Sequence, residues 1–302
     1  MKMKKFVALM LAMLMALSLV ACGQEAAPAE DAAAPADEAP EVVDYSAMGI
    51  DELKACLTTV TDGKLTVATS PDFAPYEFYS IDENGDYQLA GFDMALAQYI
   101  ADYLGLELEV IPMDFDGTLA ELAAKKVDLS LAGYSPDPSR MDKMDFSDIY
   151  YKGGQSFVTV KDNADMFKSL EDTNKPELKI GAQNGSIQLD LANENSPESD
   201  IVPLVKVTDI IAELLAGTLD GAYIETAVAE TYAINYPDLA VVLPVPYDAE
   251  GSAVGVSKDN APLLAAVNLA VNAALEDGSM DKFVADANDL SSGNVYEGLL
   301  EG

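Results

Sequence analysis

Arg140 is the single arginine of this 302-residue chain, and it lies in the stretch LAGYSPDPSRMDKMDFS, residues 131–147. The other basic residues are lysines. A guanidinium is a planar fork that grips a carboxylate through two parallel hydrogen bonds, whereas an ammonium is a point charge. Arg140 is therefore a candidate carboxylate-binding residue, with an arginine of no particular role as the plain alternative.

The composition restricts other chemistry. The chain has no histidine, which excludes histidine-based triads and histidine-ligated metals. It also shows no glycine-rich phosphate loop, no CxxC pair and no nucleophile elbow. A net charge of −35 argues against nucleic acid, which requires a basic patch. We therefore expect no metal, no cofactor and no nucleic-acid partner.

The elements that must position Arg140 alternate between strand and helix. KLTVATS (64–70) is typical of a buried strand, and GFDMALAQYIADYLG (91–105) has helical spacing and ends in Gly105, which suits a helix C-terminus. LELEVIPM alternates like a strand, TLAELAAKK is helical, and VDLSLAG ends as a strand at Gly133. This order predicts an α/β fold with a mainly parallel sheet.

The second half repeats the pattern. ELKIGAQ, SIQLDLANEN, TDIIAELLAG and LDGAYIE predict strand, helix, helix and strand, with Thr208 as an N-cap and Glu225 at a strand end. This predicts two lobes built alike, with the extended segments 153–161 and 239–247 as places where the chain crosses between them. In open α/β sheets ligands lie outside the carboxyl ends of strands, so Gly133 and Glu225 are candidate walls of a cleft.

The sequence resembles the solute-binding proteins of polar amino-acid ABC transporters, the bacterial extracellular family 3. The likeness rests on ATSPDFAPYEF (68–78), GFDMALAQYIADYLG (91–105) and the run from Met113 to Tyr151, and IGAQNGS and DGAYIETAVA extend it. It covers nearly everything after residue 60. It implies a two-lobed periplasmic-binding-protein type II fold, in which each lobe is a mainly parallel sheet flanked by helices and two hinge strands join the lobes.

The resemblance also implies a ligand site. Arg140 would pair with the ligand α-carboxylate, and Glu225 would hold its α-ammonium. The remaining contacts carried over from the family are the strand end and hydroxyl at Gly133 and Ser135, the helix start at Ser186 and Ile187, the aromatic pair Phe73 and Phe115, and the side-chain-reading position Ser70. Three positions depart from the family pattern: Ala95 replaces an acid, Ile187 a hydroxyl and Glu225 an aspartate.

Several of these residues have simpler interpretations. Phe73 and Phe115 are candidates for plain core residues, Ser135 for a cap of the segment after it, and Glu225 for a solvated acid. We expect the aspartates at 72, 114 and 116 to be solvated or capping residues. Because Ser70 stands where relatives that bind cationic or amide side chains often carry Asp, the sequence favours an uncharged polar ligand, unless Asp72 or Glu77 points inward.

The first residues resemble a bacterial lipoprotein signal. Three lysines precede an apolar run that ends in LVAC, which predicts cleavage after residue 21 and lipidation of Cys22. An ordinary signal peptide or an uncleaved anchor is the alternative. The acidic, Ala- and Pro-rich segment up to residue 44 lacks aromatic residues and is typical of a disordered stalk. Cys56 is left without a disulfide partner.

These expectations combine into one organisation. We expect a signal peptide at 1–21, a lipid-anchored stalk at 22–44, the first lobe at 45–157, the second at 158–243, and a return to the first lobe at 244–302. The function implied is a monomeric, extracytoplasmic, lipid-anchored protein that is not an enzyme. It captures a polar amino acid and delivers it to an ABC transporter permease in the membrane. A cyclohexadienyl-dehydratase-like enzyme and an amino-acid sensor lipoprotein are the alternatives.

Overall fold

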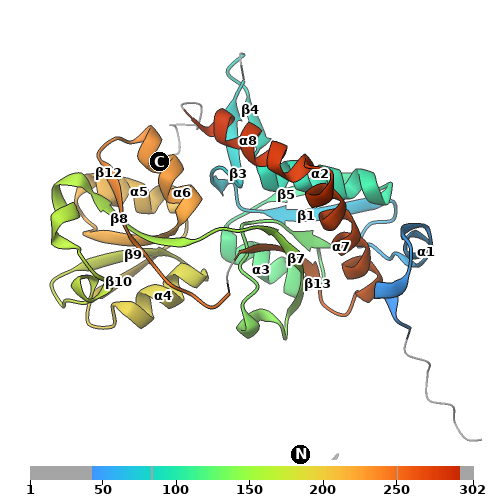
Figure 1. The fold of residues 1–302 in the computed structure, drawn as a ribbon, viewed down its shortest axis with the longest axis horizontal. Coiled ribbons are helices and arrows are strands. Elements are labelled where there is room, and N and C mark those ends of the chain that lie inside the picture. Colours follow the sequence, from blue (N-terminus) through green and yellow to red (C-terminus); the bar gives the residue numbers. More distant parts are fainter. Residues whose placement is uncertain (1–42, 83, 250, 293–302) are drawn as a thin grey trace, which may run out of the picture. The chain divides into compact units, whose positions relative to one another are not determined.

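The structure is a computed structural model that describes residues 43–82, 84–249 and 251–292. The predicted signal peptide, the lipidation site Cys22 and nearly all of the predicted stalk lie outside the described residues. The described residues from 44 onward form one compact unit. This unit contains two five-stranded sheets and one small three-stranded sheet (Figure 1).

The first lobe is built on a sheet of strand order β5-β1-β6-β13-β7. Strands β5, β1 and β6 run parallel, and β13 is antiparallel to both of its neighbours. The bounds of the sheet strands are β1 (Lys64–Thr69), β5 (Glu107–Pro112), β6 (Leu129–Ser130), β7 (Met144–Tyr151) and β13 (Ser252–Ser257). The antiparallel hairpin sheet of this lobe consists of β2 (Asp72–Phe73), β3 (Glu77–Ile81) and β4 (Tyr87–Ala90).

Helices cover both faces of the first sheet (Figure 1). Leu65 and Val67 of β1 pack with the apolar residues of α2 and α7, whereas Ala68 packs with Leu122 of α3. Side chains on the two faces of β1 therefore pack into two different hydrophobic cores, as expected for a strand that is buried on both faces. The helices of this lobe are α1 (Ile50–Cys56), α2 (Phe92–Leu104), α3 (Phe115–Ala123), α7 (Ala261–Glu276) and α8 (Ser279–Ser291), with 3₁₀ helices η1 (Tyr45–Ala47) and η2 (Pro138–Arg140).

The second lobe repeats this topology with the order β10-β9-β11-β8-β12. Three strands are again parallel, and β8 is antiparallel to β11 and β12. The strands are β8 (Gln155–Val160), β9 (Lys179–Gln183), β10 (Asp200–Leu204), β11 (Gly221–Glu225) and β12 (Leu239–Pro244). The helices are α4 (Ile187–Asn195), α5 (Val207–Ala216) and α6 (Thr226–Asn235), with η3 (Lys161–Met166) and η4 (Leu170–Thr173).

The faces of the second sheet separate in the same way. Phe157 and Tyr223 pack with α4, and their neighbours Val158 and Ile224 pack on the opposite face with α5 and α6. The prediction of two similarly built α/β lobes is therefore confirmed, and Gly105 ends α2 in the left-handed conformation with φ of 74°. The chain passes between the sheets in the connections β7 to β8 and β12 to β13 (Figure 1).

One local prediction is wrong. Thr208 is not the N-cap of its helix, because α5 begins at Val207 with Lys206 as the N-cap residue. Lys206 makes no side-chain capping hydrogen bond. Thr208 is buried inside the first turn, and its hydroxyl has no hydrogen-bond partner among the described residues.

Candidate ligand-binding site

Gly133 follows β6 and sets the first wall of the site. Its φ of 59° lies in the left-handed region, and a Cβ built on it would come within 2.7 Å of Cε1 of Phe73. Its N–H donates to Oδ2 of Asp93 over 3.0 Å. Glycine is therefore needed here both for the backbone conformation and for the close approach of the Phe73 ring.

Arg140 lies at the end of η2 and reaches toward the second lobe. Its Nη2 donates to the carbonyl oxygen of Gly185 over 3.0 Å, and its Cζ lies 6.0 Å from the ring centroid of Phe115. Asp137 caps η2 by accepting from the N–H of Ser139 over 2.7 Å, which fixes the turn that carries Arg140. The cation is thus held against an aromatic face, a favourable arrangement for a guanidinium.

The residues after Gly185 form the start of α4. Ser186 is the N-cap, and its Oγ accepts from the N–H of Leu189 over 3.2 Å and donates to the carbonyl oxygen of Gln183 over 2.7 Å. Ile187 is the first helical residue and is buried. The start of a helix carries partial positive charge. Arg140 of the first lobe therefore lies next to a second positive group, the start of α4 in the second lobe. Such a pair suits an anion such as a carboxylate.

Glu225 lies at the end of β11 and is buried, so its interpretation as a solvated acid is wrong. It caps α6: Oε2 accepts from the N–H of Val228 over 2.9 Å, and Oε1 accepts from the N–H of Gly154 over 3.2 Å. Burial raises the pKa of Glu225 to about 7, against the opposing effect of these hydrogen bonds and one from Tyr76. A neighbouring ammonium would restore the full negative charge.

The remaining predicted site residues are also in the interior. Phe73 and Phe115 are buried, with ring centroids 5.4 Å from Tyr76 and 5.5 Å from Tyr134, respectively. Ser135 is buried and is not the cap of the following turn, because Asp137 has that role. Ser70 is buried, and its Oγ donates to Oδ1 of Asp72 over 2.8 Å.

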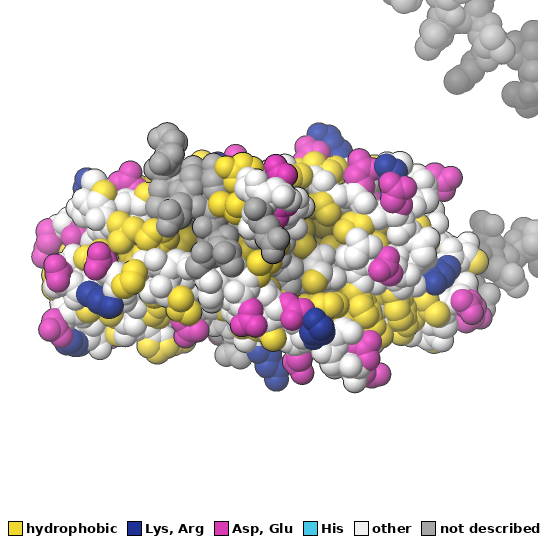
Figure 2. Space-filling model, turned by 90° about the horizontal axis from the view of Figure 1, so that it is seen from above, with side chains coloured by type: hydrophobic (Ala, Val, Ile, Leu, Met, Phe, Trp, Pro, Cys, Tyr) yellow, Lys and Arg dark blue, Asp and Glu magenta, His cyan; other side chains and the backbone are white. Residues whose placement is uncertain are grey.

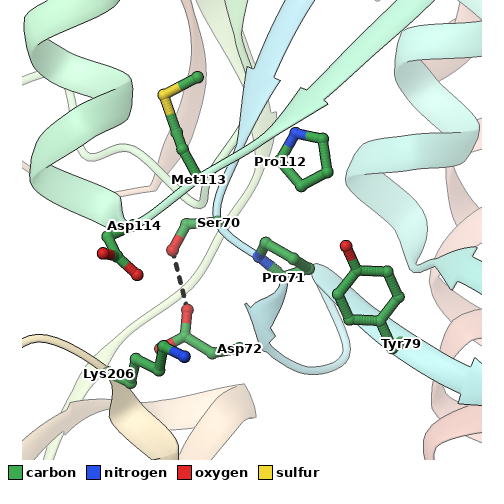
Figure 3. Close-up of a pocket in the computed structure, with 8 residues that line it drawn as sticks. All are labelled: Ser70, Pro71, Asp72, Tyr79, Pro112, Met113, Asp114 and Lys206. Atoms are coloured by element: carbon green, nitrogen blue, oxygen red, sulfur yellow. Dashed lines mark hydrogen bonds between the residues drawn. The ribbon is translucent and has the colours of Figure 1, made fainter.

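Ser70 also lines a pocket to which both lobes contribute (Figure 3). Lys206 comes from the second lobe, and the first lobe supplies Ser70, Pro71, Asp72, Tyr79, Pro112, Met113 and Asp114. Two carboxyl groups and one ammonium therefore line this pocket.

Asp72 is not solvated, so of its two predicted roles only that of a capping residue is left. It is 6% exposed, and burial raises its pKa to about 6. Its Oδ2 accepts from the N–H of Val207 over 2.6 Å and from Nε2 of Gln183 over 3.3 Å, both in the second lobe. Asp116 also crosses between the lobes, since its Oδ2 accepts from Nδ2 of Asn184 over 3.2 Å.

Two further buried acids, Glu77 and Asp93, lie behind Gly133. The sequence did not predict that they form a pair. Glu77 and Asp93 are both fully buried. Burial, followed by the charge of Asp93, raises the pKa of Glu77 well above its usual value, and burial raises the pKa of Asp93 to about 6. Both effects favour the neutral form of Glu77, which lies beside the acid that orients Gly133.

On the face shown in Figure 2, acidic side chains and a few lysines are scattered, and the lysines do not gather into a basic patch. No group of acidic or cysteine side chains in residues 43–82, 84–249 and 251–292 is arranged to hold a metal ion. Among these same residues, no helix has the length and apolar character needed to cross a bilayer.

Comparisons with known proteins agree with this geometry. Residues 65–286 match the bacterial extracellular solute-binding proteins, family 3. ArtP, an arginine-binding extracellular protein of Bacillus subtilis (strain 168), is 34% identical over 223 residues, which are 72% of this chain and 84% of ArtP. Cyclohexadienyl dehydratase of Pseudomonas aeruginosa is 26% identical over 200 residues, 66% of this chain and 73% of the enzyme.

A solved structure gives the same result. The amino acid ABC transporter substrate-binding protein AbpA of Streptococcus pneumoniae, bound to L-arginine, has a TM-score of 0.73 and 35% identity, and the match covers 80% of this chain and 99% of AbpA. The two-lobed architecture predicted from the resemblance is confirmed. This chain belongs to the bacterial extracellular solute-binding proteins, family 3.

Proposed function

We propose that this protein is the substrate-binding component of an amino-acid ABC importer. The observation that carries the proposal is that Arg140 of the first lobe meets the start of α4 in the second lobe, which also holds the buried Glu225. An amino acid carries one carboxylate and one ammonium on the same carbon, and these groups match the two ends of the site. Because Arg140 and Glu225 belong to different lobes, the ligand itself would hold the lobes together.

L-arginine is the ligand we propose first. The preference for an uncharged ligand rested on Ser70, which stands where relatives often carry Asp, and it applied unless Asp72 or Glu77 pointed inward. Asp72 is buried and lines the pocket beside Ser70. Asp114 adds a second carboxyl group to that pocket. The arginine-binding relatives support the same choice. An ancestral arginine-binding protein solved with glutamine, at 34% identity and a TM-score of 0.68, makes glutamine the main competitor.

A thermal-shift screen with the twenty amino acids and cystine tests this proposal. A ligand present at about 100 times its Kd stabilises the folded protein by about 2.7 kcal/mol. We expect L-arginine to give the largest shift. A larger shift with glutamine, serine or cystine would overturn the ligand assignment, and no shift with any of them would overturn amino-acid binding.

The proposal treats the protein as a binder rather than an enzyme, in keeping with the relatives of higher identity. Cyclohexadienyl dehydratase is a more distant match. Burial raises the pKa of Glu225 to about 7, however, and a carboxyl group with such a pKa suits general acid–base catalysis. Incubation with prephenate and arogenate separates the two functions. Product formation that is lost in Glu225→Gln would favour the enzyme.

We also propose the organisation outside the site. Cleavage after residue 21 and lipidation of Cys22 would hold the protein at the outer surface of a membrane through a stalk at 22–44. The folded part would be a monomer with two lobes, the first formed by residues 45–157 and 244–302 and the second by residues 158–243, and it would meet its permease at the membrane. Cys22→Ala should move the protein from the membrane fraction to the soluble fraction without changing its affinity. Retention of that variant in the membrane would count against lipid anchoring.

A further inference from the structure

Helix α5 of the second lobe receives its N-terminal cap from the first lobe. The N–H of Val207, the first residue of α5, donates to Oδ2 of Asp72 over 2.6 Å, a contact that spans 135 positions of the sequence. The local N-cap residue, Lys206, makes no side-chain capping bond. The acceptor that Asp or Ser normally supplies from within its own helix start therefore comes from β2.

Further hydrogen bonds meet at the same residue. Asp72 accepts from Nε2 of Gln183 over 3.3 Å through Oδ2, and from Oη of Tyr232 over 3.2 Å through its backbone carbonyl oxygen. Both donors belong to the second lobe, and both bonds are buried. By contrast, the interlobe bonds of Arg140 to Gly185 and of Asn184 to Asp116 are exposed.

Asp72 also lines the pocket to which Ser70 contributes. Ser70 donates to its Oδ1 over 2.8 Å, and both residues line the pocket of Figure 3. The ring of Phe73, which follows Asp72, packs in the same apolar cluster as Val207 and Tyr232. The carboxyl group thus has one oxygen on the pocket wall and the other on the second lobe.

We propose that Asp72 is a closure latch, a residue that favours the closed arrangement of the lobes by capping α5 across the interface. This rests on the proposed function, in which the lobes separate and close. When the lobes separate, the Asp72 carboxyl group and the first turn of α5 become hydrated, and when they close they pair. The latch therefore contributes to affinity through the closed fraction, because apparent affinity scales with the population of the binding-competent state.

Three variants isolate the capping bond. Asp72→Ala removes the acceptor, whereas Asp72→Asn keeps an acceptor oxygen for Val207 and a donor for Ser70. Val207→Pro removes the donor from the other side without touching the pocket. Proline is well tolerated at the first helical position, and Lys206 before it is extended, with φ of −119° and ψ of 144°, as the residue before proline must be.

The test combines calorimetry with L-arginine and small-angle scattering of each variant with and without L-arginine. We expect Asp72→Ala and Val207→Pro to weaken binding by about tenfold and to lower the closed fraction, and Asp72→Asn to stay within about threefold of the wild type. The double variant Asp72→Ala with Val207→Pro should bind no more weakly than the worse single variant, because both remove the same bond. Far-UV circular dichroism checks that each variant is folded.

Hydrogen exchange of amides in the ligand-free protein is a second test of the capping bond, and it does not depend on which ligand binds. The Val207 amide should exchange faster in Asp72→Ala than in the wild type, by a factor set by the closed fraction of the ligand-free protein, and should exchange at the wild-type rate in Asp72→Asn. Equal affinities in all variants, or equal losses in Asp72→Ala and Asp72→Asn, would overturn the latch. Failure of the wild type to bind L-arginine would count against the proposed ligand alone, and hydrogen exchange would still decide on the latch.

Discussion

The guanidinium of Arg140 in the first lobe donates to the carbonyl oxygen of Gly185 in the second, 3.0 Å away, immediately before the start of α4. A guanidinium has five N–H donors in a fixed plane, so one bond to Gly185 leaves donors for a ligand carboxylate. This contact brings the cation to the helix start that would share the carboxylate. It is the relationship on which the proposed site depends.

Arg140→Lys should lower amino-acid affinity by about tenfold or more, because an ammonium keeps the charge but not the fork. Arg140→Ala should cost about 2–5 kcal/mol of binding free energy. Titration calorimetry measures both. Lys143→Ala is the matched control, since Lys143 lies on the same segment with an exposed side chain and should bind like the wild type. Unchanged affinity in Arg140→Ala would refute the assignment.

Binding should depend on pH through Glu225. Its pKa is about 7 in the ligand-free protein, and an ammonium ligand requires the carboxylate, so affinity should fall as the pH drops from about 8 to about 5. Binding near pH 7 should also release protons, which calorimetry in buffers of different ionisation enthalpy detects. In Glu225→Gln the affinity should be lower and the Glu225-dependent proton release absent. Proton release that persists in that variant would assign it to another group.

Stability without ligand should change with pH in the opposite sense. The pKa values of Glu225, Asp72, Asp93 and Glu77 are all raised by burial above their usual values. Protonation of such groups favours the folded state, so the contribution of Glu225, Asp72 and Asp93 is fully present below about pH 4 and is lost as the pH rises through about 6 to 7. The contribution of Glu77 has the same sign. Melting temperature should therefore fall between about pH 5 and pH 8.

Glu77→Gln is the control for that prediction. It removes one of the four acids while keeping the shape of the side chain. We expect this variant to be as stable as the wild type near pH 5 and more stable near pH 8, where ionisation of the buried carboxyl group is costly. A wild-type melting temperature that rises toward pH 8 would show that the buried acids do not dominate.

Gly133→Ala should destabilise the protein by about 1–3 kcal/mol and weaken binding, because it combines strain at positive φ with a clash against the Phe73 ring. Gly105→Ala separates the two effects. Gly105 also has positive φ, at 74°, but a Cβ there meets no atom within 4 Å. Chemical denaturation should show the larger loss at Gly133, and affinity should change only there.

A chain starting at Asp44 should fold and bind like the longer protein, because the described residues from 44 onward form a compact unit of their own. The measurement is a comparison of melting temperature and affinity for chains starting at residue 23 and at residue 44. A loss of more than about threefold in affinity would show that the preceding segment contributes to the folded part.

The sequence allowed prediction of the features that depend on local pattern. Strand and helix alternation gave the two similar lobes, and the single arginine and the acid after LDGAYI pointed to Arg140 and Glu225. Contacts between residues far apart in the sequence could not be predicted from local pattern. Thr208 had the best local chemistry for an N-cap, yet the N-cap position lies two residues earlier, at Lys206, where Asp72, far away in the sequence, supplies the acceptor for the first N–H of α5.

The misjudgement of Asp72 has the same origin. Nothing in SPDFAP distinguishes a solvated aspartate from one buried against a second lobe. The pairing of Glu77 with Asp93 likewise depends on how β3 meets α2. The proline residues that flank this segment were the available signal, because they mark a chain whose course is constrained rather than a mobile loop.

In the proposed site, Arg140 and Glu225 hold the two charged groups of an amino acid from opposite lobes. Calorimetry with L-arginine and with agmatine, which is arginine without its carboxylate, tests it most directly. We predict that agmatine binds the wild type at least about 100-fold more weakly than L-arginine, and that Arg140→Ala removes most of this difference. Equal binding of the two compounds by the wild type would contradict the account.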